Sequence, residues 1–300
     1  MRRKDHRSSP QQLREMQAEL GVLQKADGSC KFSMGKTIVI CSVNGPEASM
    51  KEKGDGAIVD VIFQPRDKRP SEEEKEYEMM IRESLENVIL LSLYPRTIIT
   101  ISVQVVQDDG SLLSASLNSA VLALLDAGVA LKSALVSLSC SYLSSGDCLL
   151  DPLKMEQDFD SVLYSSDSST FVEYYKSSLS SGQKIIKPKG HACFIFDATK
   201  LKKKSQQHDG EEEDTSLITC LTEGIFTDEA LQTCINMAKE GAHTVYNLIR
   251  FTMERKSTTP ILPVSTPPQT TNKLPPSQQN VVTPSTPEKK GSGFLKPKEK

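Results

Sequence analysis

The sequence contains no tryptophan, few aromatic residues (5%) and only four histidines, and its seven cysteines form no CxxC pair. Structural zinc sites place cysteines and histidines at short, regular spacings, so the common zinc-binding folds are excluded. Most of the cysteines lie within apolar runs, where a reduced thiol behaves as a small hydrophobic side chain. We therefore expect an intracellular protein that has neither disulfide bonds nor a zinc site.

Long hydrophobic runs are also missing. The most apolar stretch, residues 120–136, is interrupted by Asp126, Gly128 and Lys132 and is too short to span a bilayer. Residues 1–4 are basic, but no apolar segment of the kind found in signal peptides follows them. We expect a soluble protein with no signal peptide and no membrane partner.

The chain has no excess of positive charge, because 36 Lys and Arg residues face 39 Asp and Glu residues and the formal net charge is -3. Domains that bind nucleic acid mainly through bulk electrostatic attraction are usually strongly basic. Any contact with nucleic acid is therefore expected to be local or shared with partner proteins.

The signatures of several enzyme classes are absent. The sequence has no Gly-x-Ser-x-Gly elbow of a serine hydrolase, no Walker A loop and no GxGxxG dinucleotide-binding turn. The histidines fall in separate segments, so no arrangement of nucleophile, base and orienting group can be read from them. They are His6, His191, His208 and His243.

Composition divides the chain into three parts. Residues 256–300 are rich in Pro, Thr, Ser, Gln and Lys, so burial cannot offset the entropy of ordering them, and we predict a disordered tail. Residues 1–18 are predicted to be a flexible N-terminal segment, and the stretch 11–19 is compatible with a helix. The predicted globular domain is 19–255, with polar or charged insertions near 165–190 and 200–214.

Within the domain, the apolar pattern alternates between the periods of strands and of helices. Ser71 followed by three glutamates is typical of a helix N-terminus, and apolar spacing extends this helix to Pro95. Residues 112–127 form a second, strongly apolar helix, and a third begins at Thr227. Repeated strands and helices indicate an α+β sandwich. Strands are expected at 30–34, 37–43 (ended by Asn44-Gly45-Pro46), 57–63, 97–106, 134–142, 148–150, 192–197 and 216–221.

An ordered series of short motifs resembles the RNase PH family over roughly residues 19–253. No single motif is distinctive, but their order and spacing are. The series is Gly28-Ser29, Gly35-Lys36-Thr37, Val43-Asn44-Gly45-Pro46, Tyr94-Pro95-Arg96-Thr97, Asp108-Asp109-Gly110-Ser111, Asn118-Ser119-Ala120, Leu125-Asp126-Ala127-Gly128 and Leu150-Asp151-Pro152. The resemblance implies the β-α-β-α sandwich that this family shares with domain 2 of ribosomal protein S5.

The same resemblance implies a place in the core of the eukaryotic RNA exosome. There, RNase PH-like subunits form a six-membered ring around an RNA channel, together with S1/KH-type cap subunits. The implied locations are the nucleus, the nucleolus and the cytoplasm.

The resemblance also implies where catalytic residues would lie, and several of them are replaced. In active members a Gly-Gly-Thr-Arg series opens a helix whose N–H groups and arginine hold phosphate. The matching arginine position is Leu113, which cannot bind phosphate. A second family arginine falls at Glu83, where a carboxylate would repel phosphate. Of two catalytic carboxylates, Asp151 matches the first and Gln157 replaces the second, so we expect a catalytically inactive subunit that needs no cofactor.

Two enzymatic alternatives remain open. Asp151, Glu156, Asp158 and Asp160 could together hold a divalent metal ion for hydrolysis of RNA or DNA. Residual phosphorolytic exoribonuclease activity would use the same segment. The competing interpretation, which we favour, is a solvated acidic loop. Convergence of these carboxylates around one point would support hydrolysis.

Four basic residues are candidates for contact with RNA phosphates: Arg66, Lys68, Arg69 and Arg96. The alternative for each of them is ordinary surface charge. Ser111, at the start of the second helix, could attract an anion weakly, although capping is the more common role of a serine there. We therefore predict a non-catalytic, RNA-contacting structural subunit that supports 3′-to-5′ RNA processing and decay, including maturation of ribosomal RNA.

Overall fold

Five strands form the first β-sheet of the computed structural model, which describes residues 3, 5–48, 56–66, 72–157, 188–201 and 216–258. The strand order is β1-β2-β3-β5-β4, so β1 and β4 are the edge strands. β4 pairs with β5 in parallel, and the other neighbours are antiparallel. The strands are β1 (Met16–Leu20), β2 (Gly28–Met34), β3 (Thr37–Ala48), β4 (Ile58–Gln64) and β5 (Thr97–Gln107).

A second sheet contains four antiparallel strands in the order β7-β6-β8-β9. β6 is buried along its whole length, whereas most residues of the edge strand β9 are exposed. The continuous apolar run of β6 is therefore explained by burial of both faces of the strand. The strands are β6 (Leu135–Leu143), β7 (Cys148–Leu150), β8 (Pro188–Asp197) and β9 (Leu217–Gly224).

Helix α2 (Leu112–Ala127) lies at the centre of the fold. Every residue from Leu113 to Leu124 is buried, and the helix contacts β2 and β3 of the first sheet and β6 of the second. A helix that is buried on all faces needs elements packed against it on every side. Gly128, at φ 73°, ends the helix and donates its N–H to the carbonyls of the last turn.

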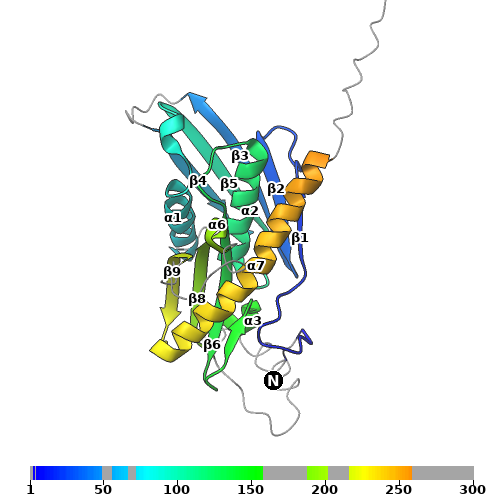
Figure 1. Ribbon diagram of the computed structural model, residues 1–300, viewed down its shortest axis with the longest axis vertical. Coiled ribbons are helices and arrows are strands. Elements are labelled where there is room, and N and C mark those ends of the chain that lie inside the picture. Colours follow the sequence, from blue (N-terminus) through cyan, green and yellow to red (C-terminus); the bar gives the residue numbers. More distant parts are fainter. Residues whose placement is uncertain are drawn as a thin grey trace, which may run out of the picture. The chain divides into compact units, whose positions relative to one another are not determined.

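Helix α7 (Asp228–Thr258) crosses the outside of the fold and contacts β6, β7 and β1 (Figure 1). Its buried side chains recur at helical spacing and form one apolar face: Cys234, Ala238, Ala242, Val245 and Ile249. Helix α1 (Glu72–Glu86) packs on β4. The shorter helical segments are η1 (Leu91–Leu93), α3 (Lys154–Gln157) and α6 (Ala198–Leu201).

The predicted α+β sandwich is confirmed, and so are several of its elements. α2 has the predicted bounds, β5 extends the predicted strand by one residue, and β6 and β7 form the predicted hairpin. Most of the elements predicted correctly are strongly apolar runs bounded by glycine. In these runs the residues that form the core and the residues that turn the chain are both evident in the sequence.

Several predicted boundaries were wrong, and two of them show why. The helix after Ser71 ends at Glu86 rather than near Pro95, because Ile89 leaves the helix to bridge Leu131. β3 continues past Pro46 to Ala48, with a register shift between Asn44 and Glu47. A shift of this kind accommodates a proline, which has no N–H to donate.

The N-terminal segment also differs from the prediction. Where the structure describes it, the segment is packed rather than flexible: Arg3, Arg7 and Arg14 are buried. β1 begins at Met16 within the stretch thought compatible with a helix. The polar sequence has no strong preference of its own, and pairing with β2 decides its conformation.

Several predictions concern residues outside the described part. Most of the insertions at 165–190 and 200–214 and nearly all of the tail fall there, although residues 188–190 begin β8 and α7 extends to Thr258. Within the described part, no helix is long and apolar enough to cross a membrane. All seven cysteines are free thiols, and only Cys220 is exposed.

Candidate functional site

Three segments meet where the resemblance places its catalytic centre. The first is the turn from β5 into α2, which contains Ser111. The second is the loop from Asp151 to Gln157 after β7. The third is the N-terminal arm, by which we mean Arg3 and residues 5–15. Hydrogen bonds connect each segment to at least one of the others.

Asp151 is fully buried, and arginines surround its carboxylate. Arg14 donates to both carboxylate oxygens, at 2.8 and 2.6 Å, and adds its backbone N–H at 3.0 Å. Nη1 of Arg7 lies 3.5 Å from Oδ2. Burial alone would raise the pKa of Asp151, but the hydrogen bonds and charge of Arg14 outweigh it and lower the pKa below the ordinary value.

The same arginines hold the backbone around Asp151. Arg3 and Arg7 each donate to the Asp151 carbonyl oxygen at 2.9 Å, and Arg3 also donates to the Leu150 carbonyl oxygen at 2.7 Å. Arg3 forms an ion pair with Glu156 at 2.7 Å. Burial and the neighbouring charge of Arg3 lower the pKa of Arg7. The N-terminal arm is thus fastened across the loop that carries Asp151.

Ser111 lies at the N-terminus of α2 with a left-handed backbone (φ 56°), and its side chain does not cap the helix. The prediction of a serine cap was therefore wrong. Its hydroxyl instead donates to the Pro152 carbonyl at 3.2 Å, and its backbone N–H donates to Oε1 of Gln157 at 3.1 Å. A neutral amide oxygen thus occupies the position at which a helix N-terminus would receive an anion.

The other end of the Gln157 amide faces His191 of β8. Nε2 of Gln157 lies 3.2 Å from the nearer ring nitrogen of His191. Burial lowers the pKa of His191 to about 4, although a hydrogen bond with the Cys140 backbone acts in the opposite direction. His191 is therefore neutral near pH 7 and supplies no charge to the site.

The remaining predicted positions lie elsewhere or outside the described residues. Leu113 is 6% exposed and belongs to the hydrophobic core, and Glu83 is exposed on α1. Arg66 and Arg96 are both exposed, consistent with either RNA contact or ordinary surface charge. Lys68, Arg69, Asp158 and Asp160 fall outside the described part.

The described carboxylates do not converge into a metal site. Asp151 pairs with Arg14, and Glu156 pairs with Arg3. In the ranges that the structure describes, no group of three or more His, Cys, Asp or Glu side chains could hold a metal ion. The prediction of a solvated acidic loop was nonetheless wrong for Asp151, which is buried as the counter-ion of the arm.

The arginines of the arm hold the Asp151 loop in place, and sequence reasoning missed them. Arg3, Arg7 and Arg14 stand in a polar segment with no helical or alternating pattern. Their partners lie more than 130 residues further along the chain. The only indication in the sequence was basic charge near residue 1, and such charge is equally typical of a segment exposed to solvent.

Comparison with known proteins identifies the fold. Residues 12–130 match the 3′ exoribonuclease family, domain 1 (RNase_PH). The exosome complex exonuclease RRP46 homolog of rice is 28% identical over 253 residues, covering 83% of this chain and 94% of the relative. The protein of the same name from Arabidopsis thaliana is 37% identical over 157 residues, which is 52% of this chain and 65% of the relative.

A solved structure agrees with the sequence comparisons. The crystal structure of rice Rrp46 matches with a TM-score of 0.65 and 27% identity, covering 84% of this chain and all of the rice chain. This match covers a larger share of the chain than residues 12–130. This chain therefore carries an RNase PH domain and has the fold of the RNase PH family.

Proposed function

We propose that this chain is a non-catalytic, RNA-contacting subunit of an exosome core ring, and that it supports 3′-to-5′ RNA processing and decay. One observation carries this: the groups that would serve catalysis are engaged by the chain's own side chains. The Asp151 carboxylate is buried against Arg14. The Ser111 N–H is bonded to Gln157. Phosphate or a metal ion would have to displace these partners.

The two parts of this function have different support. Membership of an exosome is supported by the names of the rice and Arabidopsis relatives, which are exosome complex proteins. Both names also contain the word exonuclease, so they do not support the lack of catalysis. That part follows from the residues of this chain.

Phosphorolysis requires a cation beside the attacking phosphate. The side chain at the matching position, Leu113, is apolar and packed in the core. A leucine offers no charge and no hydrogen bond to phosphate. The exposed Glu83, at the other matching position, would repel phosphate if it faced the site.

Metal-dependent hydrolysis is the second candidate function, and the ion pairs of the site argue against it. A metal ion bound by Asp151 would displace Arg14 and Arg7, both buried. Removing one partner from a buried ion pair costs about 3–5 kcal/mol, because the other charge is left uncompensated. Recruiting Glu156 would break its pair with Arg3 as well.

The proposed partners are RNA, the neighbouring RNase PH-like subunits of a six-membered ring, and S1/KH-type cap subunits. Arg66 and Arg96, both exposed, together with Lys68 and Arg69, are the proposed phosphate contacts. We propose nuclear, nucleolar and cytoplasmic locations. Imaging of a fluorescently tagged chain would test these locations, and exclusion from the nucleus would contradict them.

The direct test of catalysis uses the purified chain and end-labelled single-stranded RNA, with or without phosphate and with Mg²⁺ or Mn²⁺. We expect no shortening of the RNA under any condition. Phosphate-dependent shortening would overturn the interpretation of Leu113. Metal-dependent shortening that is abolished by Asp158→Asn with Asp160→Asn would establish a hydrolase. Asp151→Ala is unsuitable as a control, because it removes the counter-ion of Arg14.

A further inference from the structure

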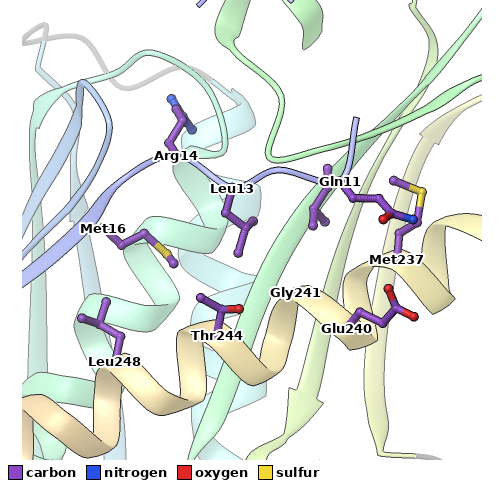
Figure 2. Close-up of a pocket in the computed structure, with 10 residues that line it drawn as sticks. Gln11, Leu13, Arg14, Met16, Met237, Glu240, Gly241, Thr244 and Leu248 are labelled. Carbon is purple, nitrogen blue, oxygen red and sulfur yellow. The ribbon is translucent and has the colours of Figure 1, made fainter. Parts of the chain in front are cut away.

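An open groove of about 520 Å³ separates the N-terminal arm from α7 (Figure 2). Its lining is mixed: apolar side chains alternate with Gln11, Arg14, Glu240 and Thr244. Leu13 and Met16 line the side of the arm and β1, and Met237 and Leu248 line the side of α7. The approach of α7 is permitted by Gly241, where an added side chain would meet the end of Leu138 at 2.9 Å. The groove meets the site described above at Arg14, whose guanidinium is engaged by Asp151.

The apolar surface of α7 continues beyond the groove. Thr244, Leu248 and Phe251 follow at spacings of four and three residues, so they lie on the same face of the helix. Phe251 is 62% exposed, although it is a large apolar side chain. Apolar side chains in a groove that leads into an exposed aromatic side chain are typical of a surface that another protein covers.

The backbone of β1 borders the same groove and has an open edge. In the described part of the chain β1 pairs only with β2. Gly21 donates to β2 and the Glu15 carbonyl accepts from Gly35. Since hydrogen bonding alternates along an antiparallel strand, the backbone groups of Met16 and Ala18 point away from β2. Such an edge is a template for an added strand.

Glu240 is the exposed charged residue in the groove lining, because Arg14, the cation there, is buried and paired with Asp151. Glu15 and Glu19 are exposed along the open edge, on the face of β1 opposite to Met16. Glu19 pairs with Lys31 at 3.5 Å. The complementary ligand therefore carries lysine or arginine next to its apolar residues.

We propose that the β1 edge and this groove bind an extended segment of another polypeptide, with apolar side chains at alternate positions and a flanking Lys or Arg. The segment adds a strand to β1 through the backbone of Met16 and Ala18. Its apolar side chains enter the groove toward Leu248, and its basic side chain lies near Glu240. Main-chain bonds then supply affinity and the groove supplies specificity. This site adds a partner of defined chemistry to the proposed ring function and does not depend on that function.

The test is a selection from a displayed library of random heptapeptides on the full chain, with two variants for comparison. Thr244→Arg places a long charged side chain in the groove from an exposed position. Gln232→Arg is the matched control, because it adds the same side chain to an exposed position on another face of α7.

We expect enriched peptides to alternate apolar residues and to carry a flanking basic residue. They should bind Thr244→Arg at least about tenfold more weakly and Gln232→Arg unchanged, and Glu240→Lys should weaken them about threefold. Binding should also slow amide hydrogen exchange at Met16 and Ala18.

No enrichment, a different sequence pattern, or equal binding to Thr244→Arg would overturn the proposal. So would unchanged exchange in β1. Concentration-dependent dimerisation that Thr244→Arg abolishes would instead assign the surface to a second copy of this chain. Each of these outcomes is independent of the RNA degradation assay.

Discussion

Asp151 has a left-handed backbone at φ 51° in the loop after β7. Both its side-chain carboxylate and its backbone carbonyl accept hydrogen bonds from arginine. The carboxylate accepts hydrogen bonds from Arg14, and the carbonyl accepts them from Arg3 and Arg7. A buried carboxylate remains ionised only where such donors replace its lost hydration. At the scale of single residues, a position that resembles a catalytic one has a structural task here: it fastens the N-terminal arm.

We expect Asp151→Asn to lower the free energy of unfolding by about 3–5 kcal/mol, because Arg14 would lose its nearest counter-ion in a buried position, whereas Arg7 keeps its pair with Asp5. Urea denaturation followed by circular dichroism measures the change. The control is Glu254→Gln, which removes the exposed ion pair with Arg250 and should leave the midpoint unchanged. An Asp151→Asn midpoint equal to that of the control would mean that the arm does not depend on this charge.

His191 predicts an acid sensitivity with a defined pH window. Its folded pKa is about 4, and its unfolded pKa is about 6.5, so the unfolded chain binds more protons between these values. Stability is therefore fully present above about pH 6.5 and falls as the pH decreases toward 4, by about 3 kcal/mol. Urea midpoints from pH 4 to 7 should vary less in His191→Asn than in the unsubstituted protein. An equally steep profile would assign the effect to another group.

Some residues of the site were predictable from sequence and others were not. Leu113 and Gln157 fall at positions that the resemblance to the RNase PH family marks as an arginine and a carboxylate, so their replacement was visible from that resemblance. The hydrogen bond from Ser111 to Gln157 was not visible, because it joins residues 46 positions apart. The bonds of Arg3, Arg7 and Arg14 depend on even longer separations, which no periodicity encodes.

At the scale of elements, the sequence was informative where local pattern and burial agree. α2 is strongly apolar and is flanked by Gly110 and Gly128, so its limits follow from its own sequence and the glycines beside it. β1 is the opposite case, because its polar sequence becomes a strand only when β2 lies beside it. The end of α1 was missed because Ile89 keeps the helical apolar spacing while it bridges Leu131.

The contact between β2 and α2 leads to a prediction with a matched comparison. A Cβ at Gly28 would collide with backbone atoms of Ala123 and Ala127, whereas a Cβ at Gly241 would meet only the flexible ends of Leu150 and Leu138. We expect Gly28→Ala to destabilise the protein by about 3 kcal/mol, since backbone cannot move aside. Gly241→Ala should change stability by less than about 1 kcal/mol, because alanine also favours the helix. Thermal unfolding of both variants measures the difference, and equal losses would refute the packing argument.

At the scale of the whole molecule, the distribution of charge limits how the chain meets RNA. The formal net charge is -3, and three of the arginines that contribute to it are buried in the arm. The surface is therefore more acidic than the composition suggests. Strong RNA binding through bulk charge is not expected from the chain alone.

RNA contact should therefore depend on assembly and on a few exposed arginines. Arg66→Ala with Arg96→Ala should weaken RNA binding by an assembled ring several-fold and reduce the slope of log Kd against log salt concentration by about 1.4–1.8, for two lost phosphate contacts. Fluorescence anisotropy with labelled single-stranded RNA between 50 and 200 mM salt, as a rough range, provides the measurement. An unchanged slope would show that neither arginine contacts an RNA phosphate.

The position of the arm has a consequence for biosynthesis. Arg3 and Arg7 are translated before Asp151, whose carbonyl they bind, by 148 and 144 residues respectively. At about 5–20 residues per second, the arm waits roughly 7–30 s for its binding site to exist. During that interval its cations lack the carboxylate and carbonyl partners of the folded protein. The arm is thus made early and finds these native contacts late.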